Sequence, residues 1–418
     1  MQHNQLLNDG SRIADITFSG AAVPVPDYGA YRNNATANPG LPAGAAAPAP
    51  YVNLVDPDFT TPSTWKASAA YRRQFGSHLT TTATLLYSRT TGDYMYVDRN
   101  LPATPSFTLS DEEGRAVFVP ANTIDAAGRT LNANALASTQ LGRVLELTST
   151  GEGDERAAVI EAEATLPRSA TISASYTRNQ ARDNTTYGCC LARTATTFTA
   201  IKSDPRDLSG SWGPSDTDFR HKLVVSASVP MKWGILVGGR YVGANGRPFS
   251  AIVNGDINGD EATSNDLAFI FDPNDPATPT AIATSMRKVL DNPQNVARDY
   301  LRANLGRIAS RNGAYAPWTE RIDVRFAKTI RSIRGQYAEI GLDVFNVANL
   351  INRNWGAEYQ LPVGISNQNP VVQRIPLLNV VGFNQTTRQY TYTVNENFGV
   401  LQKGGNPYQI QLAVRYGF

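Results

Sequence analysis

The amino-acid sequence predicts an all-β protein, an antiparallel β-barrel whose strands cross a membrane. Three observations predict this fold. Apolar and polar side chains alternate in many segments of about ten residues. The connections between these segments are alternately short and long. The sequence also lacks a run of about eighteen apolar residues that would form a membrane helix. Because successive side chains of a strand point to opposite faces, each segment offers one face to lipid and the other to water.

The end of the chain shows the alternation most clearly. One face of the predicted last strand is apolar and has aromatic residues at both ends. Its members are Tyr408, Ile410, Leu412, Val414, Tyr416 and Phe418. The opposite face consists of Gln409, Gln411, Ala413, Arg415 and Gly417. Aromatic rings at both ends of an apolar band are typical of a strand that spans a bilayer.

The same alternation recurs upstream. Segments that show it are residues 79–87, 158–166, 170–176, 223–229, 235–241, 322–330 and 338–344, with a partial strand near residues 12–19. Their second face is often acidic, basic or hydroxylated, which the core of a β-sandwich would exclude and a water-filled lumen accepts. Counted back from Phe418, the pattern predicts about ten membrane strands.

The connections between these strands alternate between tight turns and long loops. The short ones, which contain Gly or Pro, are residues 76–77, 167–169, 231–234 and 332–335. The long ones are approximately residues 20–62, 100–150, 182–215, 248–318 and 349–406. Outer-membrane barrels have short periplasmic turns and long extracellular loops. We therefore predict one partial barrel domain over residues 1–418, in which 1–62 form a partial strand and a Pro/Ala-rich extracellular loop and 63–418 form barrel strands and loops.

Composition excludes several functions. The formal net charge is +2 and no basic cluster occurs, so no nucleic-acid partner is predicted. The three histidines, His3, His78 and His221, lie in no arrangement typical of a nucleophile or a metal centre, so we predict no enzyme. Cys189 and Cys190 are adjacent in a predicted external loop, where either a strained disulfide or two thiols fits their spacing.

One loop carries oxygen-bearing side chains at alternate positions. Asp256, Asn258 and Asp260, completed by Asp266, would present converging oxygens to a calcium ion. An EF-hand would also need Gly and Glu where Glu261 and Leu267 stand. Two interpretations account for the spacing: a calcium site of another type, or Asx turns that need no metal. No other cofactor is predicted.

Apolar residues recur at helical spacing over residues 286–308, with Pro293 between two parts. This pattern predicts two short helices that pack against neighbouring loops, or alternatively a surface for a partner. On the predicted lumen face, charges of mixed sign are expected to pair across strands. They are Arg321, Asp323, Arg325, Glu339, Asp343 and Arg415.

Several short motifs occur in an order that resembles a known family. They are Asp204-Pro205-Arg206-Asp207, Trp212, Pro214-Ser215-Asp216, Asp218-Phe219-Arg220-His221, Asp256 to Asp260, Asn265-Asp266-Leu267, Arg311-Asn312, Pro317-Trp318, Arg321-Ile322-Asp323 and Asp343 to Asn349. From about Trp65 onward the chain resembles the barrels of Oar-like TonB-dependent outer-membrane receptors. The last aromatic strand is similar to the signal by which the barrel-assembly machinery recognises its clients.

The resemblance implies a barrel of about 22 strands, closed by a plug domain and driven by the TonB energy-coupling complex. The sequence contains no plug, no coupling box and no signal peptide, since Met1 to Gly10 is polar. We therefore expect the chain to be the C-terminal portion of a longer barrel protein. Its expected partners are outer-membrane lipid, the plug domain, the TonB complex and the assembly machinery.

The function expected from this resemblance is ligand uptake or surface signalling by a receptor in the outer membrane of a Gram-negative bacterium. A non-energised porin-like or adhesive surface barrel is the main alternative. A soluble extracellular β protein is a third interpretation.

Overall fold

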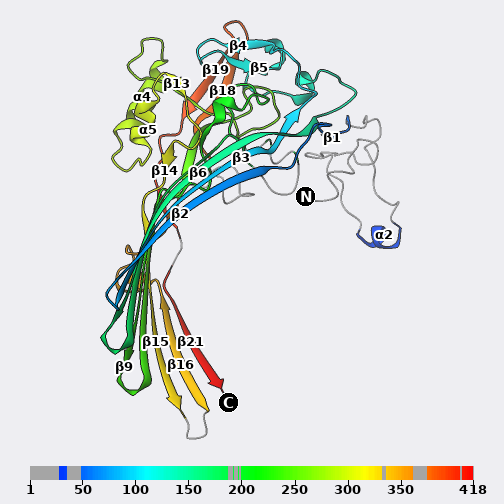
Figure 1. Ribbon diagram of the computed structural model, residues 1–418. Coiled ribbons are helices and arrows are strands. Elements are labelled where there is room, and N and C mark those ends of the chain that lie inside the picture. Colours follow the sequence, from blue (N-terminus) through cyan, green and yellow to red (C-terminus); the bar gives the residue numbers. More distant parts are fainter. Residues whose placement is uncertain are drawn as a thin grey trace.

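The computed structural model describes residues 28–34, 49–186, 192, 196, 199–331, 336–360, 374–404 and 407–417. Its main feature is a continuous antiparallel sheet whose strand order follows the chain (Figure 1). The strands along it are β2 (Ser63–Phe75), β3 (Leu79–Asp98), β6 (Val144–Leu166), β7 (Ala170–Asp183), β9 (His221–Met231), β10 (Ile235–Ala244), β15 (Thr319–Arg331), β16 (Tyr337–Phe345) and β21 (Gln409–Gly417). These nine strands confirm the predicted all-β antiparallel fold. No helix among the described residues is long and apolar enough to cross a membrane.

The strand registers place the apolar side chains of the sheet on one face. Directly paired residues share a face, and Ile172 pairs with Ala227, Val237 with Phe326, and Leu342 with Leu412. Large apolar side chains on this face are exposed, for example Leu412 by 70% and Leu85 by 64%. A sheet face this apolar and this open is suited to lipid. The opposite face carries Thr80, Glu163 and Ser173 in one hydrogen-bonded row.

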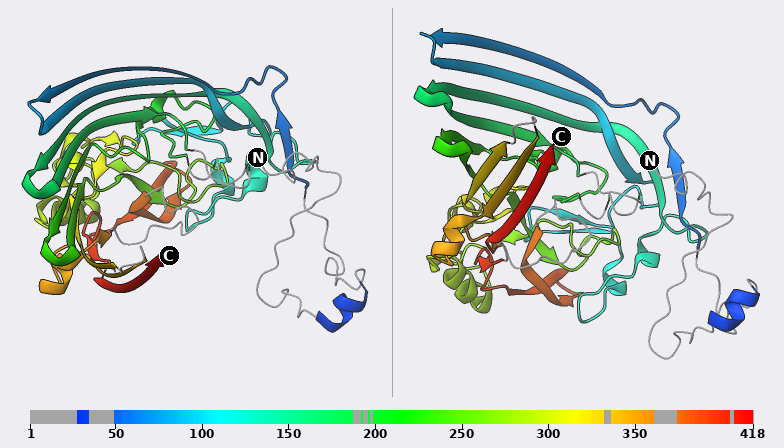
Figure 2. Two further views of the ribbon diagram at one scale, coloured as in Figure 1. Left: turned by 60° about the horizontal axis from the view of Figure 1, so that its bottom comes forward. Right: turned by 90° about the horizontal axis from the view of Figure 1, so that it is seen from below.

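The sheet is curved but open. Its edges are β2 and β21, and the view from below in Figure 2 shows an arc between them. At one end of the strands, tight turns join neighbouring strands, as predicted. Gly76 adopts a φ of +60° between β2 and β3, while the turns η4 (Pro167–Ser169) and η6 (Lys232–Gly234) join β6 to β7 and β9 to β10. The predicted turn at 332–335, the partial strand at 12–19, and Cys189 and Cys190 lie outside the described residues.

At the opposite end of the strands, the long loops form a second folded body, which we call the loop body (Figure 1). It contains a four-stranded sheet in the order β14 (Ala314–Tyr315), β11 (Pro248–Asn254), β18 (Arg374–Asn384) and β19 (Gln389–Val394). Its shorter elements are β4 (Phe107–Leu109), β5 (Arg115–Val117), η2 (Ala121–Thr123), η3 (Asn132–Ala135), η5 (Ser209–Ser211), β12 (Phe269–Ile270), β13 (Arg307–Ile308), α6 (Val347–Ile351), β17 (Tyr359–Gln360) and β20 (Gln402–Lys403). Two short strands extend the wall, because β1 (Val52–Val55) pairs in parallel with β6 and β8 (Gly213–Pro214) pairs with β7, and α2 (Tyr28–Asn33) is a separate short helix. The sequence predicted helices in the loops but not this sheet.

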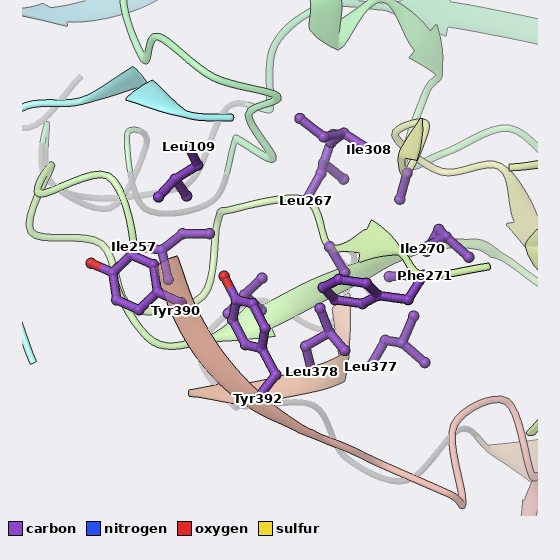
Figure 3. Close-up of a cluster of buried hydrophobic side chains, with 14 of the residues drawn as sticks. Leu109, Ile257, Leu267, Ile270, Phe271, Ile308, Leu377, Leu378, Tyr390 and Tyr392 are labelled. Carbon is purple, nitrogen blue, oxygen red and sulfur yellow. The ribbon is translucent and has the colours of Figure 1, made fainter. Parts of the chain in front are cut away.

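The loop body has its own hydrophobic core (Figure 3). Leu109, Ile257, Leu267, Leu377 and Leu378 are among its fully buried members, and they come from three separate loops. Burying apolar area is the main favourable term in folding, so this cluster explains why the loops adopt a defined structure. The core therefore fixes the polar side chains around it in place.

The predicted loop helices are confirmed, although the first begins earlier than the pattern indicated. Helix α4 spans Thr280–Asp291 and follows Pro279, and α5 spans Arg298–Ala303. A preceding proline suits a helix start because its missing N–H needs no partner there. The buried residues of α4 recur at helical spacing: Ile282, Ala283, Met286, Val289 and Leu290. This face packs into the loop core, as the first of the two interpretations expected.

The orientation of β21 can be tested with two neighbouring substitutions. Leu412→Arg should destabilise the inserted protein by about 2–4 kcal/mol, because a cation near the bilayer midplane faces lipid. Gln411→Arg should change stability little, because this side chain faces the lumen. The free energy of unfolding of each variant is measured by urea unfolding of the full-length protein reconstituted in lipid. Equal losses for the two variants would contradict the assignment of faces.

Candidate functional site

The four residues of the predicted calcium site lie together in the loop body, in the segment after β11. Asn258 and Asp266 are fully buried, Asp260 is 4% exposed, and Asp256 is half-buried. Their position is fixed because Val253 N–H donates to the Asp266 carbonyl, which ties the segment back to β11. The sequence spacing therefore identified a real cluster.

The oxygens of this cluster accept hydrogen bonds mainly from the backbone. Asp256 Oδ1 accepts from Gly259 N–H at 2.6 Å, and Asp256 Oδ2 from Glu261 N–H at 3.0 Å. Asn258 Oδ1 accepts from Asp260 N–H at 2.9 Å. These are the bonds of Asx turns, which support the second interpretation. Within the described ranges, no group of three or more His, Cys, Asp or Glu side chains has the arrangement of a metal site.

Asp266 differs from its neighbours. Its Oδ2 accepts from Ile257 N–H at 3.1 Å, whereas its Oδ1 is buried and has no hydrogen-bond partner among the residues the structure describes. The nearest cation, Arg115 Nη1, lies 3.8 Å from that oxygen. The Asn258 Nδ2 group is likewise buried without a hydrogen-bond partner among the described residues. A buried polar atom without a partner is costly, so Asp266 Oδ1 and Asn258 Nδ2 are features of the cluster that Asx turns leave unexplained.

Burial makes these carboxylates weak acids. It raises the pKa of Asp256 to about 7, with the nearby Asp260 carboxylate adding to the effect. Burial likewise raises the pKa of Asp260, and it raises that of Asp266 well above the ordinary value. The cluster therefore holds protons at a pH at which exposed aspartates are ionised.

Arg115 connects this cluster to the rest of the loop body. Its side chain is fully buried, its Nε donates to Glu112 Oε2 at 3.0 Å, and its Nη2 donates to the Leu267 carbonyl at 2.5 Å. Glu112 also accepts from Tyr392 Oη at 2.5 Å. One guanidinium therefore joins the β4–β5 hairpin, the Asp266 segment and β19.

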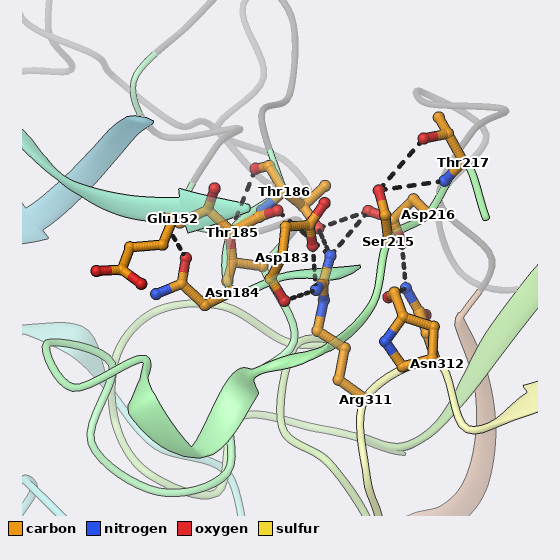
Figure 4. A network of polar contacts seen from close by, with 12 residues as sticks. Glu152, Asp183, Asn184, Thr185, Thr186, Ser215, Asp216, Thr217, Arg311 and Asn312 are labelled. Atoms are coloured by element: carbon orange, nitrogen blue, oxygen red, sulfur yellow. Dashed lines mark hydrogen bonds and ion pairs between the residues drawn. The ribbon is translucent and has the colours of Figure 1, made fainter. Parts of the chain in front are cut away.

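A second buried network centres on Arg311 and fastens the loop body to the barrel wall (Figure 4). Arg311 is 1% exposed, pairs with the carboxylate of Asp183 at the end of β7, and lies 3.3 Å from Asp216 Oδ2. Asn312 Nδ2 and Thr186 Oγ1 donate to the two oxygens of Asp216 at 2.7 and 2.6 Å. Burial would lower the pKa of Arg311, but the carboxylates of Asp183 and Asp216 raise it. The guanidinium thus stays charged and bridges wall and loops.

The predicted pairing of lumen charges across strands is found for Arg325, whereas Arg321 and Asp323 pair within β15. Arg325 on β15 lies 3.1 Å from both Asp343 and Glu339 on β16, and Arg321 donates to Asp323 at 2.7 Å. Arg415 lies directly opposite Glu339 in the register of β21.

Some of these charges line a cleft of about 350 Å³ between the wall and the loops. Its lining includes Arg240 from β10, Arg321 and Asp323 from β15, and Glu358 from the loop after α6. The cleft presents charges of both signs and is open to the lumen side of the sheet. It is a place where the structure can hold a polar solute.

Sequence reasoning named Arg311, Asn312 and Asp216 only as parts of the family-like motifs and assigned them no role. Their partners come from segments about a hundred residues apart, which no local pattern indicates. Arg115 was missed altogether. Four members of the predicted assembly signal, Ile410, Leu412, Val414 and Tyr416, lie on the lipid face, while Tyr408 precedes β21 and Phe418 is outside the described residues.

Removing Arg311 should loosen the loop body. Arg311→Met would leave the Asp183 and Asp216 carboxylates without their counterion, at a cost of about 3–5 kcal/mol. Lys288→Met removes an exposed ion pair with Glu396 and serves as the control. Limited proteolysis of the loops should be much faster only in the first variant. A rate for Arg311→Met equal to that of the control would disprove the bridging role.

The pKa of Asp256 predicts a pH dependence. Because its folded-state pKa of about 7 exceeds the ordinary 3.8, the folded state binds a proton more tightly, and stability falls as pH rises from about 4 to 7. The loss is at most about 1.4 kcal/mol per pH unit. Asp256→Asn cannot titrate, so its free energy of unfolding should vary less between pH 5 and 8. Parallel curves for variant and wild type would refute this.

Comparison with known proteins identifies the family of the chain. No curated protein matches it. Among solved structures, the outer membrane transporter YddB from Escherichia coli is similar with a TM-score of 0.44 and 9% identity. The alignment covers 88% of this chain and 34% of the length of YddB. The model of the outer membrane beta barrel domain family matches residues 4–411. With this match and the fold described above, the chain belongs to the outer membrane beta barrel domain family and lies in the outer membrane.

Proposed function

We propose that the chain forms the C-terminal wall and loops of a TonB-dependent, Oar-like receptor, which takes up a ligand or signals its presence. The observation that carries the proposal is the combination of an open wall with a folded loop body. Nine strands in a closed barrel would enclose a narrow interior, but here β2 and β21 are edges of an arc. An open edge in a membrane needs further strands, and a barrel of about 22 strands, as in the resembled family, has a lumen that a plug fills.

The loop body supports ligand capture. Its buried networks around Arg115 and Arg311 hold the loops in one arrangement, and a preorganised surface loses less entropy on binding. The cleft beside Arg240, Arg321 and Glu358 is the candidate contact for a polar ligand. A ligand held there would lie between the external loops and the lumen, and passage would follow displacement of the plug under the pull of TonB, as in the resembled family.

A non-catalytic role fits the histidines that the structure describes. The His78 carbonyl accepts from Thr165 N–H at a tight turn. His221 lies between Tyr176 and Arg178 on the lipid face. Neither belongs to a nucleophile–base pair among the described side chains, and we propose a receptor rather than an enzyme.

We also propose calcium as a ligand of the Asp256, Asn258, Asp260 and Asp266 cluster. Asp266 Oδ1 supports this role, because it accepts no hydrogen bond within the described residues and has only the Arg115 guanidinium at 3.8 Å, so a calcium ion would supply the missing ligand contact. Calcium would then displace protons, so adding it should flatten the pH dependence given above. Magnesium at the same concentration serves as the control, because it demands tighter octahedral geometry.

The receptor proposal predicts a barrel that is closed to ions at rest. The full-length protein, purified from outer membranes and inserted in a planar bilayer with potassium chloride, should give no steady conductance. It should also bind the periplasmic part of TonB. A stable open conductance without TonB binding would establish the porin-like alternative instead. A closed barrel without TonB binding would favour the adhesive one.

A further inference from the structure

Two arginines and a histidine lie on the lipid face of the wall rather than on its lumen face. Arg178 on β7 pairs directly with Ala158 on β6 and with His221 on β9. Arg156 pairs with Tyr87 on one side and Gln180 on the other. Directly paired residues share a face, and four residues beyond Arg156 along β6 that face carries Ile160, which is 62% exposed. Arg156 and Arg178 therefore lie on the same face as the apolar membrane surface, on its side nearer the loop body.

The height of these residues matches the outer edge of the bilayer. They lie about ten residues along their strands from the periplasmic turns, which at about 3.3 Å per residue and a tilt of about 40° is about 25 Å. This is the height of the apolar band of an outer-membrane barrel. Tyr87 and Tyr176 lie at the same level, as aromatic residues of the outer girdle do. The cations thus face the headgroup layer of the outer leaflet.

The positive charges are only weakly neutralised by the protein. The Arg156 side chain is 69% exposed, its guanidinium lies 3.7 Å from Asp154 Oδ2, and it stands 5.9 Å from the centre of the Tyr87 ring. Arg178 contacts Nε2 of His221, and no carboxylate of the described residues lies within ion-pair distance of it. Arg156 and Arg178 occupy diagonal positions on neighbouring strands, where like charges repel. An anion between them would remove that repulsion.

The polar groups around Arg178 are oriented toward an acceptor. A guanidinium only donates hydrogen bonds, so His221 Nε2 accepts from Arg178, and Nδ1 carries the ring proton and donates to Tyr176 Oη at 2.5 Å. The Tyr176 hydroxyl proton then remains to be donated outward. Arg178, Tyr176 and Arg156 together offer donors of the kind that bind phosphate oxygens.

We propose that Arg156, Arg178 and Tyr176 form a binding site for the phosphate groups of a phosphorylated glycolipid in the outer leaflet. The lipid is favoured over free phosphate because the donors lie at the upper edge of an apolar face, along which acyl chains would pack against Ile160 and Ala158. Basic residues beside a membrane span hold anionic headgroups by the same combination of charge and depth. The site rests on the outer-membrane location and is independent of the proposed transport function.

The test compares Arg156→Gln/Arg178→Gln with Lys66→Gln/Lys222→Gln in the full-length protein. Lys66 and Lys222 lie at a similar height on the lumen face, because they pair with Ser88 and with Thr177 and Ala244, so the control removes the same charge. Purified bacterial lipopolysaccharide, its chemically dephosphorylated form and inorganic phosphate are titrated separately against the protein in detergent. Binding is followed by the shift in unfolding temperature and by native mass spectrometry.

We expect wild type and control to bind the phosphorylated glycolipid equally, and the arginine variant to bind at least tenfold more weakly. Arg156→Lys/Arg178→Lys, which keeps the charge, should recover part of the affinity and shows that a loss is not caused by misfolding. Equal binding of the dephosphorylated lipid would overturn the phosphate assignment. Inorganic phosphate competing at the same concentration would make this an ion site rather than a lipid site. An equal loss in the lysine control would overturn the location.

Discussion

The structure depends on one constraint: inside a bilayer, every backbone N–H and C=O must find a partner within the protein. Between its edges the wall satisfies it with an unbroken series of antiparallel pairs from β2 to β21, and the outer sides of these two edge strands require further strands. Because pairing fixes the register, it also fixes which side chains face lipid, and a shift of one residue would turn the whole apolar face into the lumen. The charges on the lumen face and the cations on the lipid face both follow from that register.

Above the membrane the constraint changes, and the loop body solves a different problem. Its backbone is free to meet water, so its structure depends on an apolar core and on buried ion pairs instead. Arg115 and Arg311 are each almost without solvent contact, and each joins segments from separate loops. Buried charges of this kind contribute little net stability as pairs, but losing one partner is costly. They therefore select one arrangement of the loops over others.

The wall could be predicted from the sequence because a strand's two faces are encoded locally, in every second residue. Leu412 and Gln411 show their opposite faces without knowledge of any other strand. The loop sheet could not be predicted in this way, since β11 pairs in parallel with β18, a segment more than a hundred residues away. For the cluster of Asp256, Asn258, Asp260 and Asp266, the sequence spacing indicated residues that do lie together in the loop body. The hydrogen bonds that their side-chain oxygens accept from backbone N–H groups depend on turn geometry, which the sequence does not display.

The lipid face also explains where cations are tolerated. Near the periplasmic turns it carries Arg73, placed over the ring of Phe75 at 4.8 Å, and Lys328, whose ammonium reaches the Trp233 carbonyl. Near the outer edge it carries Arg156 and Arg178. Between these two levels, the described positions of that face hold only apolar, small or hydroxylated residues. Long basic side chains can extend to the interface from the rims but not from the middle of the bilayer. The two levels of cations therefore bound the apolar thickness of this wall, and they do so independently of the aromatic residues.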